Sequence, residues 1–449
     1  MMRTIAIAGL LVATAVPAAS AQPCEGELVQ VTEYSGRQVY YVALATSGGE
    51  ALVSWAVADP EGWRPPEFTI SRVARDGAMA SVSTPFDGFD DDGGLGAMAS
   101  SGTTIVHPSI AHDVGVLLRE PDGAARARIH LDDYRSIGKS GVRAHFDGSQ
   151  FVVTWVGGPD DASVLKAVRF DSQGGQLDAN PRVLGPAFAY SPWTATARIG
   201  GVTWVMWSTF ASGDEEFVPG ANPDLVGVRI GADGQILDAA PVVLAPGARG
   251  VVAAADGDTG LVLVMAPDGG FQVMTIDPAG AVTAGDQVTL AAEEFLLALL
   301  PSPGRDGFTM WTRRDTFTGT PVRIDGQVHA RTISRTGAVE TTPSLTLAGQ
   351  GRAIATDGRD YVLVTVDETL AGDAGEERLT VRRLRGDTFP PSTVWTTLAA
   401  APLTLTTTEF CSGPYEPYDG CQAGGPAGAG TLALIALGLV ALRGRRARR

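Results

Sequence analysis

Histidine is the side chain that most often carries acid–base and metal chemistry near neutral pH, and this chain contains few of them. The five histidines are His107, His112, His130, His145 and His329. Only His107 and His112 lie close together, and Asp113 directly follows them. Their spacing is not the i, i+4 spacing that places two histidines on one face of a helix, and the segment is predicted to be a hairpin. We therefore expect no metal site and no catalytic histidine.

Acidic and charged segments offer three further places for chemistry. Residues 86–94 are acidic and glycine-rich, but they lack the Asp-x-Asp-x-Asp-Gly spacing that makes alternating carboxylates converge on Ca²⁺, so a solvated loop is expected. Residues 255–260 align with an ordinary hairpin of the repeat described below. Residues 385–387 spell the adhesion tripeptide Arg-Gly-Asp at a predicted turn, where chance is the simplest explanation. No Gly-x-Ser-x-Gly, His-Glu-x-x-His, Cys-x-x-Cys or P-loop pattern occurs, so we predict no catalytic residue and no cofactor.

The body of the chain repeats one pattern: a turn glycine, alternating apolar residues and, in four copies, a tryptophan. The turn glycines lie 46 to 57 residues apart and are Gly48, Gly102, Gly148, Gly200, Gly257, Gly304 and Gly358. The tryptophans are Trp55, Trp155, Trp207 and Trp311. A second alternating segment with its own turn glycine follows, as in residues 164–174 and 226–234. Period-two alternation predicts half-buried strands, and the glycine junctions predict hairpins.

This repeat determines the predicted fold. Seven copies, each able to form four short antiparallel strands, predict an all-β, seven-bladed β-propeller over residues 22–410. Six blades are the alternative if the copy at Gly102 is irregular. A tandem of β-sandwich domains would need a period nearer 100 residues and a linker between domains, and neither is present. The four tryptophans are expected to be buried at equivalent places between blades.

Composition and charge narrow the classes of partner. The chain has 449 residues, of which 44% are hydrophobic and 19% charged, so a sizeable core is expected and global disorder is excluded. Six of the 34 basic residues lie in the two terminal segments, which leaves 28 basic against 50 acidic groups in the body, a net charge of −22. Such a surface repels phosphate backbones, so no nucleic-acid partner is expected. An acidic surface suits solubility, cations or basic partners.

The N-terminal segment predicts export. One arginine precedes an apolar run that has the length of a signal-peptide core and is too short to span a bilayer. The small residues ending at Ala21 form a cleavage site, so residues 1–21 are predicted to be a signal peptide. Lipidation of Cys24 is the alternative, and Pro23 directly before this cysteine argues against it.

The C-terminal segment predicts a membrane anchor. Residues 411–422 form a proline- and glycine-containing spacer, and residues 423–442 carry no charge and are long enough for a single transmembrane helix. The tail, residues 423–449, ends in arginines that are expected to stay cytoplasmic and stop transfer. These arginines are Arg443, Arg445, Arg446, Arg448 and Arg449.

Cys421, the apolar segment after it and the terminal arginines together resemble the myxobacterial-type C-terminal sorting signal (MYXO-CTERM) of surface proteins. The resemblance covers only residues 421–449. It implies sorting of the body to the cell surface with processing near Cys421. A plain single-pass anchor is the alternative.

Three cysteines in an exported chain leave one unpaired. Three pairings exist among Cys24, Cys411 and Cys421, and we favour the Cys24–Cys411 disulfide, because Cys421 belongs to the tail. Residues 25–33 could join residues 394–398 to close the ring, and that disulfide would lock the closure.

These expectations together predict an exported, monomeric propeller that is anchored to the membrane by its tail, at the cell surface or outer envelope. A repeat scaffold without a catalytic motif favours a non-catalytic binding or adhesion module for an extracellular ligand that the sequence leaves unknown. The alternative is a secreted propeller enzyme of the polysaccharide lyase or glycoside hydrolase type. Its site would be assembled from single residues of different blades in the central channel.

Overall fold

The described part of the chain is a set of seven antiparallel sheets. The computed structural model describes residues 38–58, 67–84, 94–110, 113–133, 142–158, 163–187, 194–209, 224–265, 270–318, 323–369, 376–388 and 391–398. In this part of the chain, six sheets have four strands and one has five, and every sheet is built from strands that are consecutive in sequence. We number these sheets as blades 1 to 7 in chain order.

The first three blades span residues 38–186. Blade 1 contains β1 (Gln38–Ser47), β2 (Glu50–Ala58), β3 (Glu67–Val73) and β4 (Met79–Thr84). Blade 2 contains β5 (Gly94–Leu95), β6 (Ala99–Ser100), β7 (Ile105–Ile110), β8 (Asp113–Arg119) and β9 (Ala125–Asp133). Blade 3 contains β10 (Arg143–Phe146), β11 (Gln150–Gly157), β12 (Val164–Asp171) and β13 (Arg182–Pro186).

The other four blades span residues 194–398. Blade 4 contains β14 (Thr194–Ile199), β15 (Val202–Thr209), β16 (Asp224–Ile230) and β17 (Val242–Ala245). Blade 5 contains β18 (Arg249–Asp256), β19 (Thr259–Met265), β20 (Phe271–Ile276) and β21 (Val282–Val288). Blade 6 contains β22 (Glu294–Pro301), β23 (Phe308–Thr318), β24 (Arg323–Ile333) and β25 (Leu345–Ala348). Blade 7 contains β26 (Gln350–Thr356), β27 (Asp360–Thr369), β28 (Glu376–Arg385) and β29 (Ser392–Leu398).

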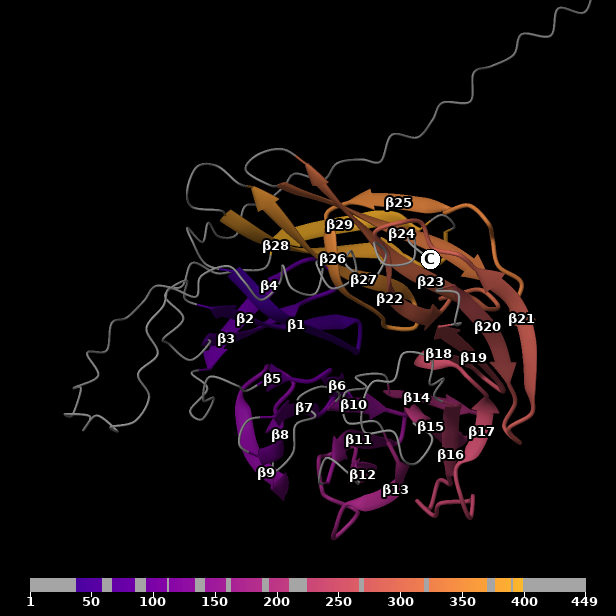
Figure 1. Cartoon of the computed structure of the whole chain (residues 1–449). Helices are drawn as coiled ribbons and strands as arrows, with labels where there is room; N and C mark the ends of the chain where they lie inside the picture. The colour runs from indigo at the N-terminus through magenta and orange to yellow at the C-terminus, as the bar shows by residue number, and fades with distance from the viewer. Residues whose placement is uncertain are drawn as a thin grey trace, which may run out of the picture. The chain divides into compact units, whose positions relative to one another are not determined.

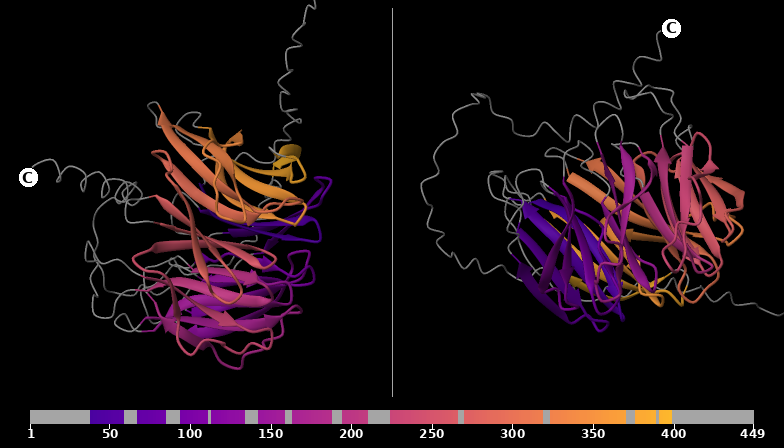
Figure 2. Two further views of the ribbon diagram at one scale, coloured as in Figure 1. Left: turned by 90° about the vertical axis from the view of Figure 1, so that its right-hand side faces the viewer. Right: turned by 90° about the horizontal axis from the view of Figure 1, so that it is seen from below.

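Apolar packing joins each blade to the next and closes a ring. The second strand of a blade is buried on both faces, as in β11, where all eight residues are buried. Seven apolar clusters occupy the seven junctions between neighbouring blades, including one between blade 7 and blade 1. Figures 1 and 2 show the indigo first blade beside the orange and yellow last blade. The predicted seven-bladed β-propeller is therefore confirmed.

The glycines of the sequence repeat all mark the turn between the innermost strand of a blade and the next strand, and all seven have positive φ. Blade 2 is the irregular copy, because its innermost edge consists of two separate two-residue strands, β5 and β6. It nevertheless forms a complete sheet, so the count is seven and not six. We call the end of the blades with these seven turns the turn face, and the end where the second strand leads to the third the loop face.

Gly358 allows a test of what these turns require. Its φ is +83°, and a Cβ added there would meet nothing within 4 Å. Gly358→Ala is therefore expected to lower the free energy of unfolding by about 1 kcal/mol through backbone strain alone. Gly358→Asn, the matched control, is expected to cost less, because asparagine tolerates positive φ better. Urea unfolding measures both, and equal stability of alanine and glycine at this position would contradict the argument.

The four repeat tryptophans are all buried, but only three occupy equivalent places. Trp55, Trp155 and Trp207 pack toward the preceding blade of the ring, whereas Trp311 packs toward blade 7, the following one. The prediction of equivalence is therefore wrong for Trp311. In β23, Phe308 and Met310 face blade 5, so Trp311, one residue further along, faces blade 7. The turn before β23 has three residues after its glycine, against one in the turns of the other three blades.

Polar contacts reinforce the junction between the last blade and the first. Arg383 of β28 is fully buried, and its guanidinium donates to Asp357 at 2.7 Å, to Asp360 at 3.3 Å and to the Gly49 carbonyl of blade 1. Arg75 of blade 1 donates a hydrogen bond across the same junction, to Asp357 of blade 7 at 3.2 Å. The ring is therefore closed between complete blades by side-chain packing and these hydrogen bonds.

The sequence-based closure of the ring is tested only in part. Residues 394–398 lie in β29, the fourth strand of blade 7, while residues 25–33 lie outside the described residues. The described ranges contain no helix long and apolar enough to cross a membrane. The predicted transmembrane segment, residues 423–442, falls beyond those ranges.

Candidate functional site

The innermost strands surround the axis of the ring, because the first strands of neighbouring blades contact one another. Their partly buried side chains include several small apolar residues that pack between blades. These are Ala43, Ala195, Ala253, Ala255, Ala298 and Ala353. No group of three or more histidine, cysteine, aspartate or glutamate side chains with metal-binding geometry occurs among the residues that the structure describes. These alanines pack the described inner strands against the apolar clusters between blades.

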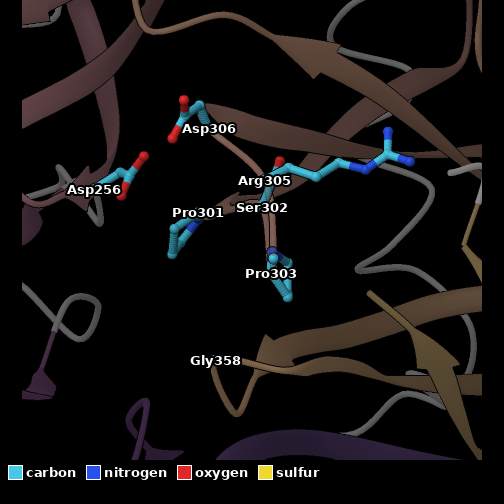
Figure 3. Close-up of a pocket in the computed structure, with 8 residues that line it drawn as sticks. Asp256, Pro301, Ser302, Pro303, Arg305, Asp306 and Gly358 are labelled. Atoms are coloured by element: carbon cyan, nitrogen blue, oxygen red, sulfur yellow. The ribbon is translucent and has the colours of Figure 1, made fainter. Parts of the chain in front are cut away.

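A pocket of about 510 Å³ lies where three of these inner strands end at the turn face (Figure 3). Asp256 ends β18 in blade 5, residues 301–306 form the end of β22 and the following turn in blade 6, and Gly358 lies in the first turn of blade 7. Three turns from three blades therefore build the pocket. We take it as the candidate site, because concave surfaces with a few fixed polar groups are where small ligands bind.

An arginine fixes the acidic side of this pocket. Asp256 Oδ2 accepts hydrogen bonds from Arg335 Nε at 2.8 Å and from the Gly307 amide at 3.3 Å. The same guanidinium lies 3.6 Å from Asp306, whose side chain is 89% exposed. The hydrogen bonds to Asp256 raise the pKa of Arg335. In Figure 3 the carboxylates of Asp256 and Asp306 lie on one side of the pocket, and the Arg305 guanidinium extends away from them.

The neighbouring wall contains a chain of hydroxyl groups. Ser302, which lines the pocket, lies 2.8 Å from the Thr309 hydroxyl, which in turn lies 2.7 Å from the Tyr361 hydroxyl. Burial raises the pKa of Tyr361, so this phenol stays neutral at physiological pH. No motif in the sequence places a general base beside Ser302. The side-chain partners of Ser302 among the described residues are hydroxyl groups. Ser302 can therefore hydrogen-bond a ligand, and no base that would activate it as a nucleophile is recorded in contact with it among the residues that the structure describes.

His107 and His145 lie in other blades than this pocket and are poorly suited to acid–base work. Burial, with a smaller contribution from Arg119, lowers the pKa of His107 to about 3. Burial lowers the pKa of His145 to about 4, against an opposing effect of Asp147. Both imidazoles are therefore neutral at pH 7, and they belong to blades 2 and 3 rather than to blades 5 to 7.

The histidine cluster of the sequence is not assembled into a site by the described residues. His107 is buried in β7, whereas Asp113 forms an ion pair with Arg128 and a hydrogen bond with His130. His112 and nearly all of the acidic segment 86–94 lie outside the described residues. Residues 385–387 form an exposed turn, with the Arg and Asp side chains 54% and 64% exposed and 3.8 Å apart.

The terminal residues singled out in the sequence also lie outside the described ranges. These are Ala21, Cys24, Cys411, Cys421, Arg443, Arg445, Arg446, Arg448 and Arg449. Export, disulfide pairing, sorting and the membrane stop therefore stay predictions.

Sequence reasoning missed most of the pocket residues, although a signal was present. The turn at Gly304 carries Arg305 and Asp306 and is flanked by Pro301 and Pro303. This turn is longer than the turns at the repeat glycines of the other tryptophan-containing blades, and it carries two charged residues next to each other. The sequence places Asp256 in an ordinary hairpin and does not indicate its approach to blade 6, which depends on the packing of neighbouring blades.

Comparison with known proteins shows similarity of fold only. No protein-family model and no curated protein sequence matches the chain. Among solved structures, a prolyl endopeptidase is 13% identical with a TM-score of 0.48, covering 82% of this chain and 50% of its own. The lectin BP39L from Burkholderia pseudomallei is 14% identical with a TM-score of 0.48, covering 78% of this chain and 97% of its own.

A puromycin hydrolase is 14% identical with a TM-score of 0.42, covering 76% of this chain and 52% of its own. The chain therefore spans about half the length of the peptidase and hydrolase chains that it matches. At these identities the peptidases and the lectin give no preference between an enzyme and a binding protein.

Proposed function

We propose that this protein is an exported, surface-anchored β-propeller that binds an extracellular ligand in the turn-face pocket without converting it. The observation that carries the proposal is the composition of the pocket. Its polar groups are held in place by Arg335 and by the hydroxyl chain, but no nucleophile–base pair is described there. A pocket of this kind can orient a ligand more readily than it can transform one.

The pocket chemistry favours a ligand that brings hydrogen-bond donors. Among the described residues, the hydrogen bonds to Asp256 fall on Oδ2, so Oδ1 is available as an acceptor. The exposed carboxylate of Asp306 lies on the same side of the pocket, and the Ser302 hydroxyl can donate or accept. Hydroxyl or amino groups of an extracellular polymer meet these requirements.

The exported and anchored part of the proposal rests on the sequence. It requires cleavage after Ala21 and retention or sorting by the tail that begins near Cys421. The acidic body supports an extracellular, soluble module and disfavours anionic partners.

Replacing Asp256 tests the proposed site. We expect Asp256→Ala to weaken binding of the recognised polymer about tenfold, because a charged acceptor is lost from the pocket wall. Asp122→Ala, which removes an exposed turn aspartate in blade 2, is the matched control and should leave affinity unchanged. Binding is measured on an array of extracellular polysaccharides and peptides and then by calorimetry. Equal binding by the Asp256→Ala protein would exclude the pocket as the site.

The enzyme alternative has one observation in its favour. Asp256 and Asp306 place two carboxylates on one side of a pocket, and a pair of carboxylates is what most glycoside hydrolases use. Arg335 contacts both side chains, at 2.7 Å from Asp256 and 3.6 Å from Asp306, so a substrate would have to share these carboxylates with a resident guanidinium. Turnover that Asp256→Asn abolishes would establish this alternative.

A further inference from the structure

A second group of unusual residues lies at the loop face, where blade 6 meets blade 7. Phe295 of β22 is 51% exposed, although it belongs to an innermost strand. The Arg313 guanidinium lies 5.6 Å from the centre of its ring. Arg313 also contacts Asp315 at 3.5 Å and the Gly351 carbonyl at 3.4 Å. These contacts are long for an arginine, so Arg313 is held loosely across this corner.

Two buried acceptors at the same corner have no hydrogen-bond donor. Asp315 is 5% exposed and Gln350 is 6% exposed, and neither Asp315 Oδ1 nor Gln350 Oε1 has a partner among the described residues. Asp315 pairs across the sheet with Gly326, and a Cβ on Gly326 would lie 2.8 Å from the Gln350 Cβ. Cross-strand partners have Cβ atoms roughly 5 Å apart, so the two acceptors belong to neighbouring side chains.

The backbone around this corner is held in a strained conformation. Glu293 has φ +64°, the one positive φ of a residue other than glycine in the described part of the chain. Its carbonyl accepts the Asp315 amide at 3.2 Å. The next residue, Glu294, is buried and accepts hydrogen bonds from Arg331 and Thr312. Strain of this kind persists only where neighbouring contacts enforce it, and it often marks binding sites.

Apart from Arg313 and the amide NH2 of Gln350, the groups that meet at this corner are acceptors. They are a carboxylate, a side-chain amide oxygen, a backbone carbonyl and the face of an aromatic ring. Carboxylates and carbonyls accept hydrogen bonds from cationic groups, and aromatic faces attract them. Anionic ligands would be repelled by Asp315, and neutral ligands would leave its charge uncompensated once Arg313 moved away.

We propose that this corner is a receptor for a guanidinium or ammonium side chain of a basic polypeptide, and that Arg313 occupies it as a built-in competitor. The incoming cation displaces Arg313 from Phe295 and donates to Asp315 and Gln350. This site lies at the opposite end of blade 6 from the turn-face pocket and is independent of the ligand bound there. The strongly acidic body would draw basic polypeptides toward it.

The test uses capped arginine, N-acetyl-arginine methylamide, as the probe and the complete exported protein as the receptor. We expect Asp315→Asn to weaken its binding about tenfold, because the buried acceptor loses its charge. Phe295→Ala is expected to weaken it about threefold, whereas Phe295→Tyr keeps the ring face and the affinity. Thermal unfolding of each variant shows that it is folded. Wild-type affinity in Asp315→Asn would overturn the proposal.

Arg313→Ala gives the sharper result. Removing the Arg313 side chain is expected to strengthen probe binding severalfold, because the probe no longer has to displace it from the corner. Arg314→Ala is the matched control: it removes the same charge from the adjacent exposed residue, and it should change affinity little. An equal gain in both variants would mean a general charge effect and would overturn the proposal. Loss of probe binding in Asp256→Ala would place the probe in the turn-face pocket, which would also overturn it.

Discussion

Arg383→Leu is expected to lower the free energy of unfolding by about 3–5 kcal/mol, the cost of removing one partner from a buried ion pair. Arg383 is fully buried, and its main partner, the Asp357 side chain, is only 1% exposed. Burial would raise the pKa of Asp357, but hydrogen bonds from the Asp360 amide and from Arg383 lower it to about 2. The variant therefore leaves a carboxylate inside the junction that closes the ring, and it also loses the hydrogen bond to Gly49.

Arg385→Leu is the matched control for this experiment. Arg385 lies two residues further along the same strand, its side chain is 54% exposed, and it is 3.8 Å from Asp387. Exposed pairs of this kind contribute about 0–1 kcal/mol, so we expect little change. Urea unfolding followed by tryptophan fluorescence measures both variants. Equal stabilities would mean that Arg383 does not hold the last blade to the first.

The second large effect concerns acid and His107. Its folded-state pKa of about 3 lies well below the ordinary 6.5, so the unfolded chain takes up this proton first as the pH falls. The free energy of unfolding is therefore unaffected by His107 above about pH 6.5, where the imidazole is neutral in both states. It falls progressively as the pH is lowered from 6.5 to 3. The full loss corresponds to roughly 5 kcal/mol, of which about 2 kcal/mol falls between pH 7.5 and 5.

His107→Leu is expected to remove this part of the pH dependence without destabilising the protein at pH 7.5. Both ring nitrogens of His107 are buried without hydrogen bonds, and an apolar side chain of similar size has no such requirement. His130→Leu is the control, because that imidazole is 53% exposed and pairs with Asp113 at the surface. Unfolding free energies measured from pH 7.5 to pH 5 compare the three proteins. A slope in His107→Leu equal to that of the wild type would show that His107 is not the cause.

The number of blades could be predicted from the sequence because each blade has the same local sequence features. Each copy needs a residue with positive φ at its first turn, and glycine supplies it at positions such as Gly48 and Gly358. The exception, Trp311, shows the limit of this reasoning. Its distance from Gly304 equals that of the other pairs, but in β23 it is Met310 and not Trp311 that faces the preceding blade, which the spacing does not show.

The site could not be predicted because it depends on contacts between distant segments. Asp256 and Arg335 are 79 residues apart, and Arg383 and Gly49 are 334 residues apart. No local spacing indicates such pairs, since the packing of neighbouring blades and the closure of the ring bring them together. The unpartnered oxygens of Asp315 and Gln350 were equally hidden, because a missing hydrogen bond has no sequence pattern.

The central claim is that the propeller binds its extracellular ligand in the turn-face pocket and releases it unchanged. The most direct test incubates the protein with the array of extracellular polysaccharides and peptides and measures bound protein and released products on the same spots. We predict binding without product formation, and about tenfold weaker binding of Asp256→Ala. Product formation by the wild type that disappears in Asp256→Asn would contradict the account and identify an enzyme.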